Sequence, residues 1–363
     1  MACSLLRAWL MFLAHPAGAR KPQPPPLPGE RLMELVKLAD QQGVLPAVAA
    51  NLQQRARSGS GGPFDQAQGR PEPFDGAHGR MGGVQASHEQ LGEALREAQR
   101  ILICRAALCL VMRSQLAEVR SSFSAAGIPC MVLKGPEFAD RLYPNPGLRP
   151  FTDIDLLIRA GDKAAARDRL GRAGYAAAPG SDASHTARRG GHAEESWTNR
   201  QAAGGTVELH WNVVNSPTLR RRISIGFDDL QTVALPGDPF PHPSPAALLL
   251  IAAIHAATAH KFDRLQPLCD VAMAARGAAG PLDVAWLRAV ALKAHASLSL
   301  AAACALAGAC LGEPACDAVA RSLNLPRRVQ WARRLLSPKV ALGAESVPAA
   351  LRRQLFREML KRI

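Results

Sequence analysis

Apolar and polar positions recur with two different periods along this chain. The helical period, with apolar residues three or four apart, runs through residues 29–54 and 87–125, and again from residue 245 to the end. Ser87 and Gln90 form the sequence signature of a capping box at the start of the second of these segments. The pattern therefore predicts a protein built largely of helices.

A short central region has the pattern of β-strands instead. Residues 128–135 (IPCMVLKG) and 151–158 (FTDIDLLI) are apolar and rich in branched side chains, and residues 195–213 have the pattern of a hairpin that turns at a Gly-Gly pair. Helices are expected between these strands, over residues 136–143 and 161–175. The predicted fold class is α+β, with a small central sheet flanked by N-terminal helices and a C-terminal helical region.

Changes in composition divide the chain into four parts. Residues 57–86 are rich in Gly, Pro and Gln and contain a tandem repeat, GPFDQAQGRP followed by EPFDGAHGRM, which is typical of a disordered insertion. We expect N-terminal helices over residues 1–56, a core with its preceding long helix over 87–240, and a helical region over 241–363. Two copies of so short a repeat are too few to build a solenoid.

Two apolar segments and the cysteines indicate in which cellular compartment the protein is expected. The first residues, MACSLLRAWLMFLAHPAGA, have features of a signal peptide, but their apolar stretch is short and we favour an amphipathic helix of the fold. Residues 246–259 are too few to span a membrane and include His255, so we expect a buried helix and no membrane partner. The eight cysteines include no CxxC pair, which disfavours a zinc site and favours small buried side chains in a reducing, cytoplasmic compartment.

The positive charge of the chain is concentrated at its C-terminal end. The formal net charge is +14, and residues 301–363 carry eleven Lys or Arg against four Asp or Glu. This balance favours a polyanionic partner such as nucleic acid, or it reflects Arg-rich solvated helix faces in a protein from a GC-rich genome. Only Trp331 and Phe356 interleave aromatic rings with the basic residues of the last segments, which favours packing or partner surfaces over nucleic-acid binding.

Two aspartates interrupt the apolar strand over residues 151–158. Asp153 and Asp155 are two positions apart, so both side chains point to one face of the strand. Neighbouring carboxylates stay ionised together only beside positive charge, and a divalent cation such as Mg²⁺ or Mn²⁺ can supply it. Because Mg²⁺ commonly binds one or two carboxylates plus substrate phosphates, the pair points to phosphoryl or nucleotidyl transfer. The competing interpretation is an edge strand whose two acids face water.

Three further segments offer side chains that would complete such a site. Glu208 lies on the polar face of the strand TVELHWNV, and it would join the aspartates if the two strands are neighbours in the sheet. The sequence VLKGP ends a strand at Lys134 and Gly135, where an ammonium group and backbone N–H groups can meet phosphates. Arg149, four residues before Asp153, is a second candidate for a phosphate contact.

The combination VLKG…LYPNPGLRPFTDIDLLI…VELHW…IHAATAHKFDRLQPLCDVA resembles the uncharacterised nucleotidyltransferases of the DNA-polymerase-β-like superfamily. The resemblance implies a mixed sheet with metal-binding acids on adjacent strands: Asp153 and Asp155 match the paired metal ligands and Glu208 the third acid. Gly135 takes the place of the glycine in the superfamily's Gly-Ser turn, but Pro136 follows it where the superfamily has Ser. The likeness extends from about residue 87 to residue 275.

The function implied is a metal-dependent nucleotidyltransferase that uses Mg²⁺ or Mn²⁺ and an NTP, with a protein, a small molecule or an RNA end as acceptor. The altered turn motivates the alternative, a catalytically degenerate binding or regulatory protein on the same scaffold. In the helical segment after residue 250, we expect His255 to be a hydrogen-bonded core histidine rather than a ligand, and Arg264 to pair with Asp270.

Overall fold

The chain divides into two compact units, Met1–Cys104 and Arg105–Ile363. The computed structural model describes residues 2–59, 80–81, 84–85, 87–178, 191–199, 204–324, 326, 327, 329, 333–342 and 347–362. Helix α4 (His88–Ser124) belongs to both units, and its start confirms the predicted capping box. The Ser87 hydroxyl accepts a hydrogen bond from the Gln90 N–H at 3.1 Å, and the Gln90 side chain accepts one from the Ser87 N–H at 3.0 Å.

Helices dominate the first unit. The elements before α4 are α1 (Ala2–Leu13), β1 (Leu27–Pro28), η1 (Gly29–Arg31), α2 (Leu32–Gln41), α3 (Leu45–Gly59), β2 (Arg80–Met81) and β3 (Val84–Gln85). The first residues do form a helix of the fold, because Trp9, Leu10 and Leu13 are buried. Helix α3 and the strands β2 and β3 extend into the range predicted as an insertion, and residues 60–79 of that range lie outside the described residues.

A five-stranded mixed sheet is the centre of the second unit, as the resemblance implied. Its strand order is β4-β5-β8-β7-β6, with β5 parallel to β8 and the other neighbours antiparallel. The strands are β4 (Cys130–Val132), β5 (Asp153–Ile158), β6 (Tyr175–Ala177), β7 (Glu194–Asn199) and β8 (Thr206–His210). The predicted hairpin is confirmed as β7 and β8, whereas β6 was not predicted. Strand β5 lies between β4 and β8, so the edge-strand interpretation of its two aspartates is wrong.

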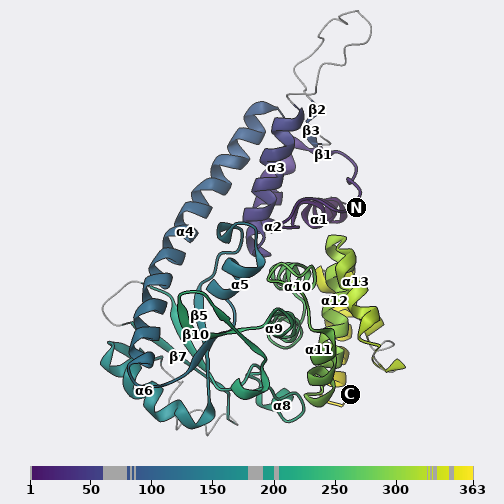
Figure 1. The fold of residues 1–363 in the computed structure, drawn as a ribbon. Helices are drawn as coiled ribbons and strands as arrows, with labels where there is room; N and C mark the ends of the chain where they lie inside the picture. Colours follow the sequence, from purple (N-terminus) through teal and green to yellow (C-terminus); the bar gives the residue numbers. More distant parts are fainter. Residues whose placement is uncertain are drawn as a thin grey trace, which may run out of the picture. The chain divides into compact units, whose positions relative to one another are not determined.

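One face of this sheet is apolar and packs on helices. Ile154 and Leu156 of β5 and Val207 and Leu209 of β8 are fully buried against apolar side chains of α4 and of α6 (Lys163–Arg172). Burying such a side chain stabilises the fold by about 1.5–3 kcal/mol. Helices α9 (Pro245–Thr258) and α10 (Gln266–Ala275) lie on the other side of the sheet (Figure 1). The period-two pattern of β5 thus fixes which face is core and which face carries the aspartates.

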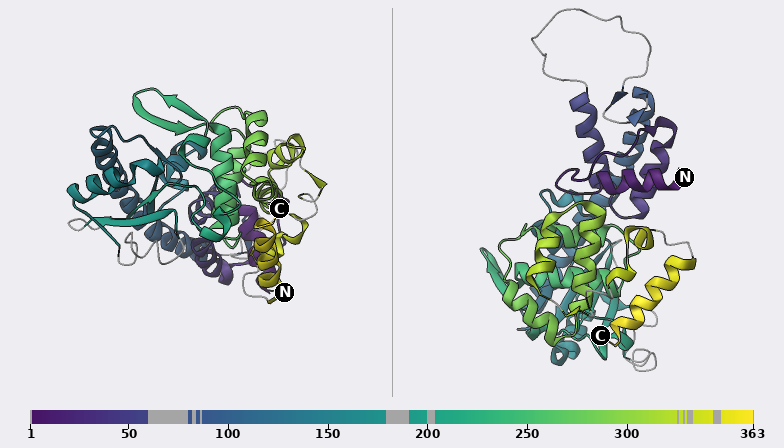
Figure 2. Two further views of the ribbon diagram at one scale, coloured as in Figure 1. Left: turned by 90° about the horizontal axis from the view of Figure 1, so that it is seen from below. Right: turned by 90° about the vertical axis from the view of Figure 1, so that its right-hand side faces the viewer.

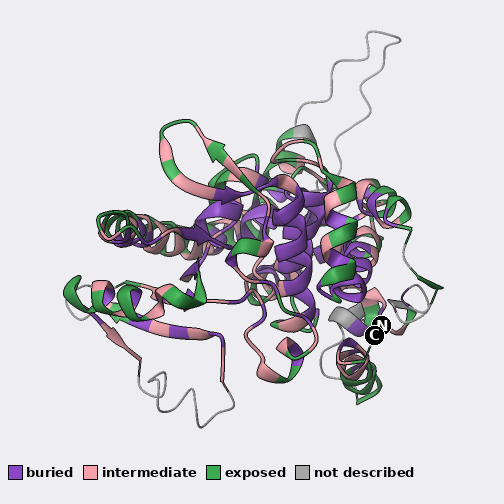
Figure 3. Ribbon diagram, turned by 60° about the horizontal axis from the view of Figure 1, so that its bottom comes forward, coloured by how far each residue is buried: buried purple, intermediate pink, exposed green. Residues whose placement is uncertain are grey.

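The C-terminal region is helical, as predicted. Short elements join the sheet to it, namely α5 (Pro136–Leu142), η2 (Pro146–Leu148), η3 (Ala160–Asp162), α8 (Pro217–Arg220) and η4 (Phe227–Asp229). After α10 come α11 (Val284–Lys293), α12 (Ser297–Leu311), α13 (Pro314–Ser322), η5 (Arg333–Leu335), α15 (Pro338–Leu342) and α16 (Val347–Leu360). Helices α12 and α13 pack against each other (Figure 2), and α9 is buried along most of its length (Figure 3). None of the helices in the described ranges is long and apolar enough to cross a bilayer.

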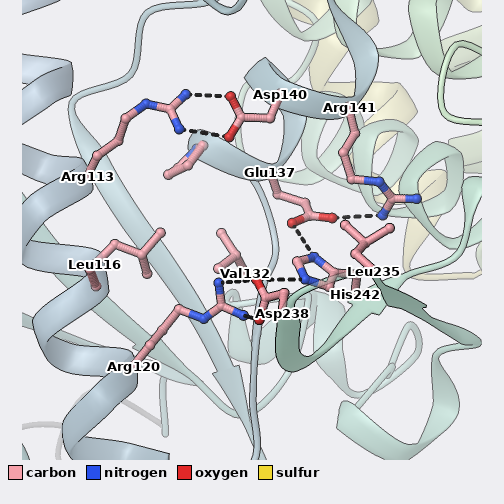
Figure 4. Close-up of a pocket in the computed structure, with 12 residues that line it drawn as sticks. Arg113, Leu116, Arg120, Val132, Glu137, Asp140, Arg141, Leu235, Asp238 and His242 are labelled. Atoms are coloured by element: carbon pink, nitrogen blue, oxygen red, sulfur yellow. Dashed lines mark hydrogen bonds and ion pairs between the residues drawn. The ribbon is translucent and has the colours of Figure 1, made fainter.

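A two-stranded ribbon, β9 (Thr232–Leu235) and β10 (Asp238–Pro243), packs beside β4. The sequence did not predict it, because three of the six residues of β10 are prolines, which are confined to edges and irregular positions of sheets. The ribbon, α4, α5 and β4 line a pocket of about 310 Å³, and its apolar lining side chains include Leu116, Val132 and Leu235 (Figure 4).

Ion pairs around this pocket fasten the ribbon to the two helices. Both terminal nitrogens of Arg120 on α4 bond the carboxylate of Asp238, at 2.7 and 2.9 Å. His242 stands between two acids, with Nδ1 2.9 Å from Glu137 and Nε2 3.0 Å from Asp238, and Arg141 bonds Glu137 at 2.7 Å. The chain of alternating charges therefore runs from α4 through β10 to α5.

We predict that His242 makes the stability of the fold depend on pH. The hydrogen bond to Glu137, with the charges of Glu137 and Asp238, raises the pKa of His242 above its ordinary 6.5. A raised histidine pKa contributes stability that is complete below about pH 6.5 and is lost as the pH rises through the folded-state value. Urea unfolding should show that His242→Gln costs more stability at about pH 5.5 than at about pH 9; an equal cost at both would contradict the assignment.

Candidate functional site

The register between β5 and β8 brings the predicted acids together. Asp155 lies directly opposite Glu208, and Asp153 lies opposite Thr206. Because paired positions of neighbouring strands share a face, Asp153, Asp155 and Glu208 point to the side of the sheet away from α4. His210, two residues after Glu208, points the same way. The sequence analysis assigned only the acid of this strand to the site and therefore missed the histidine.

Asp155, Glu208 and His210 form a compact donor set. One ligand atom from each lies within 4.8 Å of the others. His210 Nε2 is 3.1 Å from Asp155 Oδ1 and 3.5 Å from Glu208 Oε2. Asp155 is fully buried, and its Oδ2 has no hydrogen-bond partner among the described residues. A buried carboxylate oxygen without a partner is costly unless a cation or donor completes it, so these residues fit a divalent metal ion.

The second side of the site is the turn that follows β4. The Leu133 N–H donates to the Asp155 carbonyl at 3.0 Å, which places Lys134 beside β5. The Lys134 ammonium then reaches Asp155 Oδ1 at 2.7 Å, with only 14% of its side chain exposed. Lys134 and the acids are therefore together in the structure.

Charge on this face is unequal. Four carboxylates, Asp153, Asp155, Glu194 and Glu208, face Lys134 and His210 among the described residues. The charge of Arg149 also acts on Asp153, but Arg149 is paired with Asp270. A divalent cation would balance the surplus.

The pKa values follow from this crowding. Burial acts to raise the pKa of Asp155, but the Lys134 ammonium and the hydrogen bond with His210 outweigh it and hold the pKa well below its usual range. Asp153 lacks such a close partner, and burial and the Asp155 charge raise its pKa to about 6. Burial lowers the pKa of His210, yet its hydrogen bonds with Asp155 and Glu208 raise it to about 9. Lys134 and the imidazolium of His210 are the internal counter-ions of Asp155.

Residues 28–312 match the family described as uncharacterised nucleotidyltransferase. The chain belongs to this family. No curated protein and no solved structure matches the chain. The family assignment agrees with the mixed sheet and with paired acids on its polar face, and within it the roles of the individual site residues stay predictions.

Arg149, the other predicted phosphate contact of this family member, is held in a buried ion pair. Its Nε and Nη2 bond the two oxygens of Asp270 on α10 at 3.2 and 3.0 Å, and the Tyr143 hydroxyl donates to Asp270 at 2.7 Å. The expectation that Arg264 pairs with Asp270 is therefore wrong, since Arg264 is exposed and Arg149 takes that place. Nη1 of Arg149 lies outside this ion pair.

The histidines of the helical segment also differ from expectation. Helix α9 ends at Thr258, and Lys261 and Phe262 have positive φ values of 49° and 59°, so His255 and His260 are not on one helix. Their rings meet edge to face with centroids 4.7 Å apart. Burial, followed by the charge of Lys134, lowers the pKa of His255 well below its ordinary value. His255 lies on the largely buried helix α9, and whether it serves as a core histidine stays a prediction.

We predict that Gly135→Ala will destabilise the fold by about 1–3 kcal/mol, because the Lys134–Gly135 turn needs glycine. Gly135 has φ +53° and ψ −115°, and a Cβ there would lie 3.1 Å from the Asp153 carbonyl oxygen. Gly161→Ala is the control, since a Cβ there meets nothing within 4 Å and the backbone is not left-handed. Chemical denaturation gives the free energy of unfolding of both variants. Equal free energies of unfolding would contradict a requirement for glycine at the turn.

Proposed function

We propose that the protein is a metal-dependent nucleotidyltransferase that transfers a nucleoside monophosphate from an NTP to a hydroxyl acceptor. The observation that carries this proposal is the pairing of Asp155 with Glu208 on adjacent parallel strands, on the face that also carries Asp153. The surplus of carboxylates and the partnerless oxygen of Asp155 support a divalent ion there. Membership of a nucleotidyltransferase family supports the reaction class.

Each predicted residue has a role in this proposal. Asp153, Asp155 and Glu208 would hold Mg²⁺ or Mn²⁺, which supplies charge stabilisation at the phosphates and activates the acceptor hydroxyl. Lys134 and the Gly135 N–H would contact the phosphates, and Arg149 would reach them through Nη1. The metal could come from the solvent side, because Glu208 is 24% exposed whereas Asp155 is 1% exposed.

The transfer itself is an in-line displacement. The acceptor oxygen forms a bond to the α-phosphorus, and the bond from that phosphorus to the bridging oxygen breaks with its electron pair leaving on pyrophosphate. The hydroxyl proton passes to a base, for which Glu208 is the candidate because it is the more exposed of the paired acids. The acceptor is a protein side chain, a small metabolite or an RNA end.

Labelled nucleotide tests the proposal. With Mg²⁺ or Mn²⁺, label from the α-phosphate of an NTP should appear on an acceptor, label from the γ-phosphate should appear in pyrophosphate, and Asp153→Ala and Asp155→Ala should abolish both. Binding of metal and NTP without transfer to proteins, RNA or metabolites would favour the degenerate binding protein instead. Pro136 motivates that alternative, because it removes one backbone N–H from the turn.

We predict opposite effects of Lys134→Met on the two ligands of this site. Removing the ammonium 2.7 Å from Asp155 should tighten the binding of Mn²⁺ alone by about tenfold or more, because like charge is removed. The same change should weaken the binding of the metal–NTP complex, because the phosphates lose a cation. Calorimetric titration measures both, with Lys293→Met, whose side chain is 77% exposed, as control. Unchanged or weaker Mn²⁺ binding would contradict this role for Lys134.

A further inference from the structure

We propose that His210 is itself a metal ligand through Nε2, that Glu194 orients its ring, and that the site therefore prefers Mn²⁺ to Mg²⁺. This inference rests on the metal site of the proposed function and adds the identity of the ion and two residues. The resemblance to the superfamily implied an all-carboxylate set, Asp153, Asp155 and Glu208. The structure adds a nitrogen donor beside two of these acids, Asp155 and Glu208, and Asp153 lies outside the compact donor set that the three form.

The imidazole lies where a ligand would lie. As a ligand it is neutral, so a divalent ion at Nε2 would take the place of the proton that the metal-free imidazolium shares with Asp155. Nε2 is 3.1 Å from Asp155 Oδ1 and 3.5 Å from Glu208 Oε2. Neighbouring ligands of one octahedral ion with bonds of about 2.1 Å are about 3.0 Å apart, so these separations suit a shared ion. The side chain is only 6% exposed, and the ring is fixed by the strand that carries it. His210 lies on β8 beside β5, opposite Leu157 in the register.

The other ring nitrogen faces a second carboxylate. Nδ1 of His210 is buried without a hydrogen-bond partner among the described residues, and the carboxylate placed to accept from it is Glu194, whose Oε2 lies 3.6 Å away. The register of the hairpin produces this contact, because Glu194 of β7 is the direct cross-strand partner of His210. Metal-binding histidines commonly point the nitrogen that does not bind the ion at a carboxylate, which fixes the ring and makes it a better donor. His210 has this arrangement, because its Nδ1 faces Glu194 and its Nε2 faces Asp155 and Glu208.

The donor set decides the preference for the ion. Mg²⁺ takes oxygen ligands and keeps several waters, whereas imidazole nitrogen binds first-row transition ions more strongly. Replacing one oxygen donor by Nε2 therefore lowers the affinity for Mg²⁺ relative to Mn²⁺. A histidine that served only as a counter-ion of Asp155 would not change this ratio.

Pulsed electron paramagnetic resonance of the full-length protein loaded with Mn²⁺ tests the proposal directly. A directly bound imidazole produces nuclear modulation from ¹⁴N, which we expect in the wild type and which should disappear in His210→Gln. Glu194→Gln should keep the modulation but bind Mn²⁺ about tenfold or more weakly. His242→Gln, a buried histidine outside the site that also faces a carboxylate, is the matched control and should change neither result. Competition titration should show that His210→Gln lowers the Mn²⁺ to Mg²⁺ affinity ratio by about tenfold.

The outcomes separate this inference from the proposed function. If the wild type transfers nucleotide and binds Mn²⁺ but shows no ¹⁴N modulation, the proposed role of His210 is wrong and the proposed function is unaffected. This result is obtained on the wild type, so it does not depend on whether a variant folds. Modulation in a protein that transfers no nucleotide supports the ligand and counts against the proposed reaction. A wild type that binds no Mn²⁺ at all overturns both.

Discussion

Asp153→Asn will reduce nucleotide transfer by about a thousandfold and leave the fold as stable as the wild type or slightly more stable. Asp155→Asn will reduce transfer to a similar extent, but it will also destabilise the fold by about 3–5 kcal/mol. The loss of transfer corresponds to roughly 4 kcal/mol of transition-state stabilisation, which is the scale expected for a ligand of a catalytic metal. Two carboxylates on one face of one strand are thus expected to have different effects on stability.

The difference follows from their partners. Asp155 is the counter-ion of Lys134 at 2.7 Å and of His210 at 3.1 Å, so its removal leaves buried cations without a partner. Asp153 is crowded by the charges of Asp155 and Glu208, which burial makes more costly. Replacing Asp153 by a neutral amide relieves that repulsion while removing a proposed metal ligand.

Urea unfolding and label transfer, measured on the same preparations, test this pair of predictions. Asp168→Asn is a suitable control because Asp168 is a surface acid of α6, 54% exposed, and its loss should change stability by less than about 0.5 kcal/mol. If Asp153→Asn were as destabilising as Asp155→Asn, the two acids would have the same structural role and this account of the charges would fail.

The second large effect is expected at Asp270, far from β5 in sequence. Asp270→Ala should destabilise the fold by about 3–5 kcal/mol, because it leaves the buried guanidinium of Arg149 and the Tyr143 hydroxyl without their acceptor. A double variant, Arg149→Met with Asp270→Leu, should recover most of this loss, since a buried ion pair can be replaced by apolar side chains of similar volume.

A double-mutant cycle in urea with Arg149→Met, Asp270→Leu and their double variant measures the coupling between Arg149 and Asp270. Arg264→Met is the control, because the sequence had suggested Arg264 as the partner and the structure leaves it exposed. It should change stability by less than about 0.5 kcal/mol. If the double variant at positions 149 and 270 were less stable than Asp270→Ala, the unpaired charge of Arg149 would not be the reason that Asp270→Ala is destabilised.

Local patterns in the sequence predicted the parts of the fold that local chemistry determines. The capping box at Ser87 and Gln90, the alternation in β5 and the hairpin of β7 and β8 were all visible, because each depends on residues a few positions apart. The pairing of β5 with β8, which the Glu208 hypothesis required, is present in the structure. The ribbon of β9 and β10 was missed because its prolines contradict strand propensity and tertiary packing holds it.

The rest of the candidate site depends on contacts between distant residues. Arg149 and Asp270 are 121 positions apart, and the nearer Arg264 offered a simpler but wrong partner. His210 had a visible signal, since it alternates with Glu208 on one strand face, but Glu194 became its neighbour only through the hairpin register. His255 and His260 meet because a helix ends between them, at a backbone turn that periodicity does not reveal.

In the proposed reaction, Asp153 and Asp155, with Glu208 beside them, bind a divalent ion that in turn holds an NTP. Calorimetric titration of Mn²⁺ and NTP into the wild type, Asp153→Asn and Asp155→Asn tests it most directly. We expect the wild type to bind Mn²⁺ and to bind NTP much more tightly when Mn²⁺ is present. Each variant should lose at least about tenfold in affinity for Mn²⁺, and its affinity for NTP should no longer depend on Mn²⁺. Equal affinities for Mn²⁺ and NTP in all three folded proteins would contradict it.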